Sequence, residues 1–235
     1  IFADRWCLAR TNSVATVGFY GAPIDLVLRL VFVPMAIASV LFPTLTAGLA
    51  GHGHAPAAAL DGGARLLAAA LFPITLLAVG LAPEAIRLWL GAEWASHSAP
   101  VLQLGAVGLF IGGMSLGMMA LVQAAGRPDR PAIAHSLELP LHVGVVLLLA
   151  ARWGIEGAAA AFVLRIVLDH VLMAVAAVHV MRRNADFGAT RAVVRRTLAG
   201  TAAGAAMLLL VAAIGPLLLR ALLVAVLLCA FAVLA

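Results

Sequence analysis

The stretch PVLQLGAVGLFIGGMSLGMMALVQAA, residues 100–125, decides the fold class of the chain. None of its side chains is charged, and a helix of this length rises by about 39 Å at 1.5 Å per residue. The hydrocarbon core of a bilayer is about 30 Å thick, so such a helix is long enough to cross it. Inside that core every backbone amide needs a partner within the protein, which a helix provides. The stretch therefore predicts a transmembrane helix.

The composition of the whole chain leads to the same conclusion. Of its 235 residues, 65% are hydrophobic and 11% are charged, whereas soluble domains carry roughly 25% charged residues. The mean hydropathy is +1.13. A single water-soluble core cannot hide so much apolar surface behind so few charges, which excludes a soluble enzyme domain, a disordered tail and a disulfide-rich secreted scaffold. The sequence predicts an all-α, polytopic transmembrane helical bundle.

Apolar windows separated by Gly, Pro and charged residues recur along the chain, and they predict a first span that the start of the sequence truncates and seven further windows, which give about six full spans. The windows are residues 1–9, 17–46, 64–81, 100–125, 133–151, 155–181, 193–214 and 216–235. Pro23, Pro34 and Pro43 lie inside the second window, and we expect neighbouring helices or water to satisfy the carbonyls that they free. The sequence begins at Ile1 without an initiator methionine, so we expect a fragment that lacks an amino-terminal half.

The arginines set the expected orientation of the spans. All 15 basic residues are Arg, and the absence of Lys excludes a P-loop and Schiff-base chemistry. Eight lie in connectors that share one side of the membrane: Arg65, Arg127, Arg130, Arg182, Arg183, Arg191, Arg195 and Arg196. The opposite side holds four, which are Arg10, Arg87, Arg152 and Arg220. The positive-inside rule places the first group, and with it the carboxy terminus, in the cytoplasm.

The aromatic residues agree with this orientation. Five aromatic residues fall near the predicted outer interface, a depth that amphipathic rings favour. They are Trp6, Trp89, Trp94, Trp153 and Tyr20. No nucleic-acid partner is expected, because the arginines occur singly or in short clusters between apolar spans.

Charged side chains inside the spans are the candidates for function, since each costs about 2.5–3.5 kcal/mol at the centre of a membrane helix. Asp25 and Arg29 lie in the second window, and Arg165 and Asp169 lie in the sixth. Each pair has opposite signs at a spacing of four residues. One interpretation is neutralisation within the helix, which makes insertion easier. The other is a polar lumen in which Arg donates hydrogen bonds to an anionic group, and the two interpretations are compatible.

His135, Glu138 and His142 recur at intervals of three and four residues, which places them roughly on one face of the fifth window. Three such groups could relay protons through the bundle. The alternative is structural: His135 lies at the inner interface and Glu138 pairs with a neighbouring Arg. Asp4 and Arg5, in the first window, are weaker candidates for buried functional charges.

The chain shows no recognisable catalytic constellation, since neither HExxH nor GxSxG occurs in it. His52 and His54 lie in a Gly-rich connector without carboxylate or thiolate support, and we expect them to be solvated. Glu84, near the outer ends of the spans, is expected to be solvated as well. We therefore expect no catalytic residue, no metal site and no cofactor.

Several short segments, taken in order, resemble a known family. They are residues 4–10, VGFY at 17–20, LFP at 41–43, LWLG at 88–91, QAAGRP at 123–128, LELP at 137–140 and GIEGAA at 154–159, followed by Arg165. Their order and spacing over about residues 1–180 are similar to the second half of polysaccharide flippases of the O-antigen or teichoic-acid transporter type. That type belongs to the multidrug/oligosaccharidyl-lipid/polysaccharide exporter superfamily.

The resemblance implies a fold of two six-helix lobes around a V-shaped cavity, often with two extra terminal helices. Residues 1–181 would be the carboxy-terminal transmembrane lobe, 182–196 a cytoplasmic basic loop and 197–235 the two extra helices. The missing amino-terminal lobe of the same protein is then an expected partner, because alternating access needs two halves that rock against each other. The expected location is the bacterial inner membrane, with the carboxy terminus in the cytoplasm.

The same resemblance implies transport of an undecaprenyl-pyrophosphate-linked oligosaccharide, with no bond made or broken. Arg29 and Arg165 are the residues expected to bind the pyrophosphate by charge-assisted hydrogen bonds. Asp25 and Asp169 would orient them or couple cations, and Glu138 is a further candidate for the lumen. Lipid-linked oligosaccharide, membrane lipid and polysaccharide assembly enzymes are the expected partners.

Three alternatives stay open at this point. A multidrug or metabolite cation antiporter of the same superfamily would bind cations through carboxylates in the lumen. A membrane-embedded polysaccharide polymerase would need a long periplasmic loop, and the windows predict none. A scaffold that does not transport is the third, since the sequence lacks the first half of the family's fold.

Overall fold

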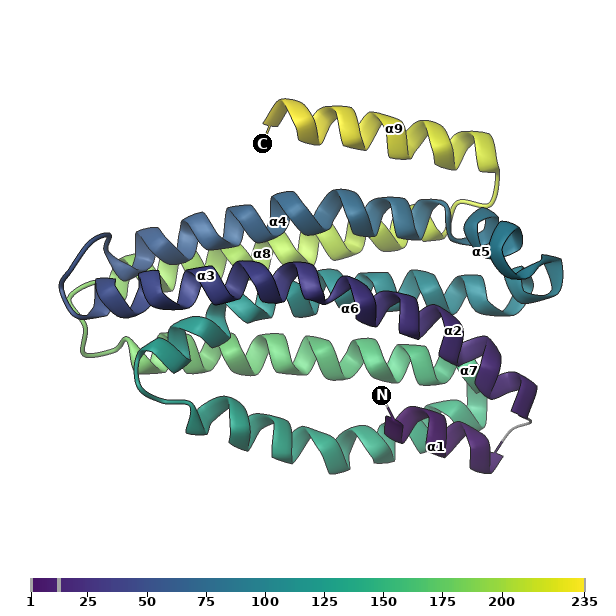
Figure 1. The fold of residues 1–235 in the computed structure, drawn as a ribbon, viewed down its shortest axis with the longest axis horizontal. Coiled ribbons are helices and arrows are strands. Elements are labelled where there is room, and N and C mark those ends of the chain that lie inside the picture. Colours follow the sequence, from purple (N-terminus) through teal and green to yellow (C-terminus); the bar gives the residue numbers. More distant parts are fainter. Residues whose placement is uncertain (1, 12–13, 235) are drawn as a thin grey trace.

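The computed structural model describes residues 2–11 and 14–234, and Figure 1 shows the path of their helices. In order these are α1 (Phe2–Thr11), α2 (Val14–Leu30), α3 (Phe32–Leu49), α4 (Pro56–Gly80), α5 (Ala82–Leu90), α6 (Ala92–Ala124), α7 (Asp129–Val180), α8 (Phe187–Ala212) and α9 (Leu217–Leu234). No strand occurs among the described residues. Five helical segments are long and apolar enough to cross a membrane, namely Val14–Leu49, Pro56–Gly80, Ala92–Ala124, Asp129–Val180 and Phe187–Ala212. The chain is therefore an all-helical, polytopic membrane bundle, as its sequence predicts.

The first long segment, Val14–Leu49, consists of α2 and α3 with the single turn residue Val31 between them. Pro34 explains this interruption, because it has no N–H for the carbonyl of Leu30 and its ring displaces that carbonyl. Backbone hydrogen bonds made by Val31 still join the two helices. The span predicted over residues 17–46 is thus present, with a short break inside it.

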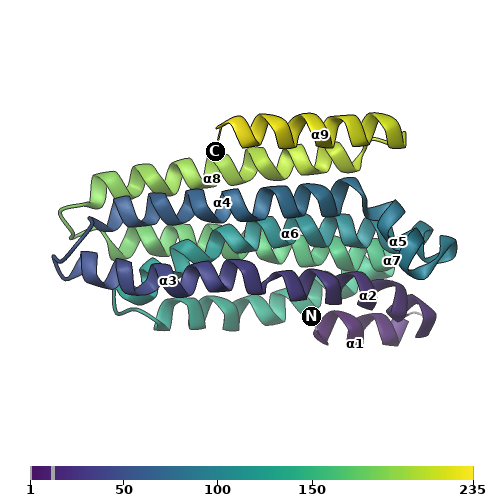
Figure 2. The same cartoon turned by 45° about the horizontal axis from the view of Figure 1, so that its top comes forward.

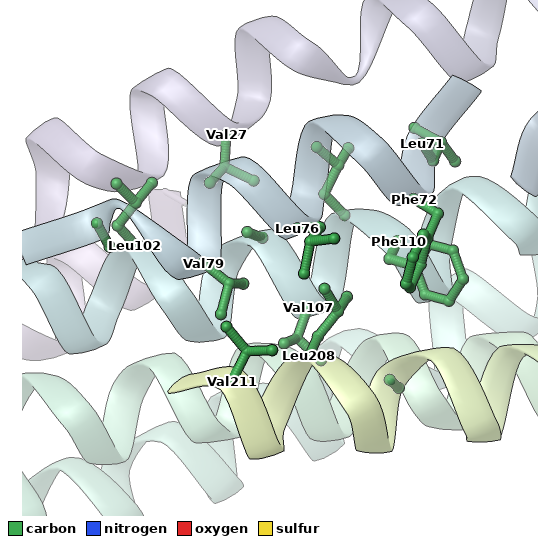
Figure 3. Packing of buried hydrophobic residues seen from close by; sticks show 14 of the residues in the cluster. Val27, Leu71, Phe72, Leu76, Val79, Leu102, Val107, Phe110, Leu208 and Val211 are labelled. Carbon is green, nitrogen blue, oxygen red and sulfur yellow. The ribbon is translucent and has the colours of Figure 1, made fainter. Parts of the chain in front are cut away.

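Helix α6 is the central element and packs against α2, α3, α4, α5, α7 and α8. Most of its residues are buried, and nearly all of these are apolar or glycine. Figure 3 shows side chains of α2, α4, α6 and α8 that meet around it. Among them are Val27 of α2, Leu76 of α4, Val107 of α6 and Leu208 of α8, all of them buried. The uncharged stretch that decides the fold class is thus the one that the other helices surround.

Glycines bring the second half of α7 close to the backbone of α6. A Cβ atom at Gly108 would lie 2.8 Å from the ring of Phe162, and one at Gly112 would lie 3.2 Å from Ile166. Both distances are shorter than or at the limit of ordinary contacts, so larger residues would push the helices apart. The small residues therefore serve packing within the bundle.

Helix α7, with 52 residues, consists of two antiparallel arms that meet at Gly154. Gly154 has φ 59° and ψ −134°, a conformation that glycine adopts readily because it lacks a Cβ atom. The first arm comprises residues 129–153 and the second residues 155–180, and Figure 1 shows them side by side. A Cβ atom at Gly157 would overlap the carbonyl group of Leu149, so the turn needs glycine there too. The fifth and sixth predicted windows thus form separate helical arms.

The basic segment predicted as a loop over residues 182–196 is a loop only in its first part. Helix α8 already begins at Phe187, so the arginines at 191, 195 and 196 lie on its first turns. The reason is local, because Arg and Ala are good helix formers and no proline interrupts them. Asp186 accepts a hydrogen bond of 2.7 Å from the backbone N–H of Ala57, which ties the remaining connection to the start of α4.

Two shorter helices, α5 and α9, complete the bundle. Helix α5 lies outside the predicted windows and begins with Pro83 in its first turn, where a proline is well tolerated. Helix α9 is apolar, shorter than the five long segments, and lies along α4 and α8 (Figure 2). Arg220 of α9 is buried and forms an ion pair with Glu84 of α5. The prediction that Glu84 is simply solvated is therefore wrong, because α9 places a guanidinium against it.

Candidate functional site

Charged and polar side chains gather where α1, α2, α6 and α7 contact one another, and we name this set the polar seam. Its members are Asp4, Arg5, Tyr20, Asp25, Ser115, His135, Glu138, His142, Arg165 and Asp169. Charges within membrane spans usually face the interior of a bundle and pair with one another, as they do here.

An Arg–Glu ion pair and a His–Asp contact join the arms of α7. Arg165 Nη1 lies 3.4 Å from Glu138 Oε2, and His135 Nε2 lies 3.0 Å from Asp169 Oδ1. Ser115 of α6 donates a hydrogen bond of 2.8 Å from its hydroxyl to Asp169 Oδ2. His135 faces Asp169 and Glu138 faces Arg165, so residue numbers rise along one arm where they fall along the other, as expected of antiparallel helices. We refer to these five residues as the inter-arm cluster.

Exposure differs strongly within the inter-arm cluster. The Glu138 side chain is 1% exposed, whereas Arg165 is 27% and His135 is 48% exposed. Glu138 Oε1 is buried and has no hydrogen-bond partner in the described part of the chain. A small pocket beside the cluster is lined by Glu138, His142, Arg165 and five apolar residues. The cluster is thus accessible at its arginine and at one histidine, and closed around the glutamate.

A second cluster joins α1 to α2 and to the first arm of α7. Asp4 Oδ2 accepts a hydrogen bond of 2.9 Å from the Tyr20 hydroxyl, and Asp4 Oδ1 contacts His142 Nε2. All three side chains are buried. Next to them Arg5 forms an ion pair with Asp25 of α2. Polar contacts therefore fix α1 against two other helices.

Asp25 does not pair with Arg29, although the two lie four residues apart on α2. Arg5 reaches Asp25 from α1 and forms the ion pair instead. Arg29 is exposed and makes no ion pair with any residue that the structure describes. The interpretation of neutralisation within this helix is wrong, because a neighbouring helix supplies the guanidinium.

Arg165 and Asp169 are not paired with each other either. Arg165 pairs with Glu138 and Asp169 pairs with His135, in both cases across the hairpin. Within a helix, a base four residues before an acid is the less favourable order, which leaves both groups available to the other arm. The prediction that Glu138 pairs with a neighbouring Arg is confirmed.

His135, Glu138 and His142 each have a different partner, although all three lie on the first arm. His135 and Glu138 pair with the second arm, whereas His142 contacts Asp4 of α1. Within the described residues no hydrogen bond joins the three to one another. The proton-relay hypothesis therefore lacks a direct chain of hydrogen bonds through these side chains.

Of the five predicted site residues, the structure brings Glu138, Arg165 and Asp169 together and leaves Asp25 and Arg29 outside that cluster. Tyr20 and Ser115 are members of the seam that sequence reasoning missed. Tyr20 is buried within the bundle, and its signal was the chain's single phenol hydroxyl inside an apolar window, which needs a polar partner when buried. Ser115 gave no such signal, because its partner lies 54 residues away.

Paired charges between the spans of a polytopic helical bundle mark a candidate ion or substrate pathway. The chain is similar to a protein of Shigella flexneri named "Putative O-antigen transporter". The two are 23% identical over 175 residues, which are 74% of this chain and 41% of that protein. The chain thus spans about two fifths of the length of this relative. No protein-family model matches the chain, and no solved structure matches it.

Proposed function

We propose that this chain is the carboxy-terminal lobe of a flippase, which carries an undecaprenyl-pyrophosphate-linked oligosaccharide across the bacterial inner membrane by alternating access. The observation that carries the proposal is Arg165, a partly exposed guanidinium held by a buried carboxylate inside a membrane bundle. The name of the Shigella flexneri relative, which refers to O-antigen transport, points to the same class of substrate.

Arg165 is suited to bind a pyrophosphate. A guanidinium presents five N–H donors in a rigid fork that matches phosphate oxygens. The 3.4 Å contact with Glu138 involves a single nitrogen, Nη1, so Glu138 positions the group without saturating it. An oxyanion that enters from the accessible side would accept the remaining donors as charge-assisted hydrogen bonds.

Arg29 is the second arginine in this proposal. It is exposed on α2 and free of ion pairs within the described residues, so it is available to an anionic head group. The aspartates act differently from what their spacing suggests. Asp25 holds Arg5, and Asp169 holds His135, so both set the packing of helices around the arginines rather than orienting the arginines directly.

The proposed arrangement of the whole protein follows from this assignment. Residues 1–181 form the second lobe, the basic segment 182–196 with the first turns of α8 lies in the cytoplasm, and α8 and α9 are the two extra helices, with the carboxy terminus also in the cytoplasm. The partners are the amino-terminal lobe of the same protein, membrane lipid, the lipid-linked oligosaccharide and polysaccharide assembly enzymes. Rocking of the two lobes around the head group would expose it first to one side and then to the other.

Complementation tests the proposal, with the full-length protein expressed in a strain that lacks its own flippase. Arg165→Ala is expected to abolish surface polysaccharide at normal membrane abundance, and lipid-linked repeat units should accumulate on the cytoplasmic side. Arg152→Ala is the matched control, because Arg152 is exposed on the same helix and contacts only Trp153 among the interactions described. Unchanged polysaccharide with Arg165→Ala would contradict the role of this arginine.

A cation antiporter of the same superfamily is the second candidate, favoured by two carboxylates, Glu138 and Asp169, in one cluster. It predicts that cells expressing the full-length protein export a cationic dye, and that Glu138→Gln abolishes this export. Dye export without any effect on polysaccharide would favour the antiporter over the flippase.

A further inference from the structure

Three groups with metal-binding chemistry converge across the α7 hairpin. His135 and Glu138 come from the first arm and Asp169 from the second, and one ligand atom of each lies within 4.8 Å of the others. His135 Nε2 and Asp169 Oδ1 are already 3.0 Å apart. Ligand atoms in a tetrahedral zinc site, each about 2.0–2.2 Å from the ion, are about 3.3–3.6 Å from one another. A movement of the Glu138 side chain that shortens its distances to the other two ligand atoms by no more than about 1.5 Å would therefore complete a three-ligand set.

Glu138 supplies an independent indication of a ligand. Its side chain is 1% exposed, and its Oε1 atom has no hydrogen-bond partner among the described residues. Arg165 contacts the other oxygen, Oε2, and at 3.4 Å this contact is long for a charge-assisted hydrogen bond. A buried carboxylate oxygen without a partner is unfavourable unless a ligand satisfies it.

The chemistry of the set selects the kind of ion. One imidazole with two carboxylates suits a borderline transition metal such as zinc, whereas Mg²⁺ and Ca²⁺ prefer oxygen ligands alone. The cluster also has the outer support that such sites use, because the Ser115 hydroxyl holds the second carboxylate oxygen of Asp169. His135, at 48% exposure, leaves one side of the cluster accessible to an entering ion.

We infer that His135, Glu138 and Asp169 form a binding site for a divalent transition-metal ion of the zinc class. The inference goes beyond the proposed transport function and does not depend on it, since metal binding is measured without transport. It also predicts competition, because Arg165 and the ion would share the carboxylate of Glu138. An ion bound there would release the guanidinium from its partner.

The test is a calorimetric titration of the full chain, purified in a mild detergent, with Zn²⁺ and separately with Mg²⁺. The background carries His52→Ala and His54→Ala, because these exposed histidines of the α3–α4 connection could bind zinc by themselves. We expect one Zn²⁺ per chain and no response to Mg²⁺. His135→Ala should weaken zinc binding by at least about tenfold, the smallest effect usual for groups that support a metal site.

Three further variants distinguish a specific zinc site from nonspecific zinc binding. Asp169→Asn should weaken zinc binding like His135→Ala, and both proteins should elute as the parent does in size-exclusion chromatography. His179→Ala, exposed on the second arm, is the matched control and should bind zinc as the background does. Arg165→Gln should bind zinc more tightly, because the competing charge is gone. Zinc binding that is absent in the background protein, or equal in all variants, would overturn the inference.

Discussion

The two sides of this bundle differ in their buried polar contacts. Around α4, α6 and α8 the contacts are apolar, and buried side chains such as Leu76, Val107 and Leu208 meet in one core (Figure 3). Where α1, α2 and α7 meet, a second apolar cluster that includes Leu8, Ile24 and Val146 is joined by the hydrogen bonds and ion pairs of the polar seam. Helix α6 contributes to both sides, through Val107 to the core and through Ser115 to the seam, so the difference lies in individual residues rather than in whole helices.

This difference indicates which side serves function. On the apolar side the buried contacts between α4, α6 and α8 are apolar and the ion pair between α4 and α8 has an exposed arginine, so buried charges are not needed to hold helices together. Charged groups in a membrane span raise the free energy of insertion, and a buried ion pair is often no more stable than apolar residues of similar size. The seam is therefore better explained by a task such as binding an anion or a cation than by stability.

Breaking the buried contact between α1 and α7 is expected to have the largest effect on stability. Asp4→Ala would leave His142 and the Tyr20 hydroxyl buried without their acceptor, which should lower the free energy of unfolding by about 3–5 kcal/mol. Unfolding by SDS in mixed micelles measures this quantity. The double variant Asp4→Leu with His142→Leu should recover part of the loss, because no charged group then remains unpaired. If the losses of the Asp4→Leu and His142→Leu single variants simply add up in the double variant, a direct coupling between the two side chains is contradicted.

A cavity on the apolar side should come next in size. Leu76 is fully buried in the core around α6, so Leu76→Ala is expected to lower the free energy of unfolding by about 2–5 kcal/mol. Leu77→Ala is the matched control, since the neighbouring Leu77 is 42% exposed and leaves no internal cavity. The same SDS titration compares the two. Equal losses would mean that α4 presents a different face to the core.

Overpacking at α6 should produce a smaller loss. Gly108→Ala places a Cβ atom 2.8 Å from the ring of Phe162, and the resulting shift should cost about 1–3 kcal/mol. Gly144→Ala on the first arm of α7 is the control, because nothing lies within 4 Å of the added atom. That variant should be neutral or slightly stabilising, as alanine is the better helix former. The change in the thermal unfolding temperature in detergent distinguishes the two variants. The same change in both would mean that Gly108 of α6 does not lie close against Phe162 of α7.

The two sides also differ in how far their sequence predicts them. The uncharged stretch over residues 100–125 and the other apolar windows suffice for the class of fold, because span length and hydropathy are local properties. The turn at Gly154 is local as well, and it falls between the two predicted windows. On this side the sequence did not predict the exact ends of the helices, such as the start of α8 at Phe187.

Apart from the Arg partner expected for Glu138, the partners in the polar seam could not be predicted, because they come from distant parts of the chain. Asp4 and His142 are 138 residues apart, and Ser115 and Asp169 are 54 apart. Rules of spacing consider one helix at a time, so they matched Asp25 with Arg29 and overlooked Arg5. The residue types of the site were therefore visible in the sequence, whereas their pairing required the packing of α1 and the hairpin.

The smallest effect is expected at an ion-pair network of the same chemistry outside the seam. Asp61 of α4 lies 2.8 Å from Arg65 on its own helix and 3.2 Å from Arg196 of α8, and both arginines are more than 60% exposed. Exposed pairs of this kind contribute about 0.2–1 kcal/mol and are screened by salt, so Asp61→Ala should hardly change the SDS titration. A loss as large as that of Asp4→Ala would show that exposure does not separate the two sets of charges. If the loss in free energy of unfolding is small and decreases further at high salt, burial rather than charge itself explains why the seam contributes more to stability than this network.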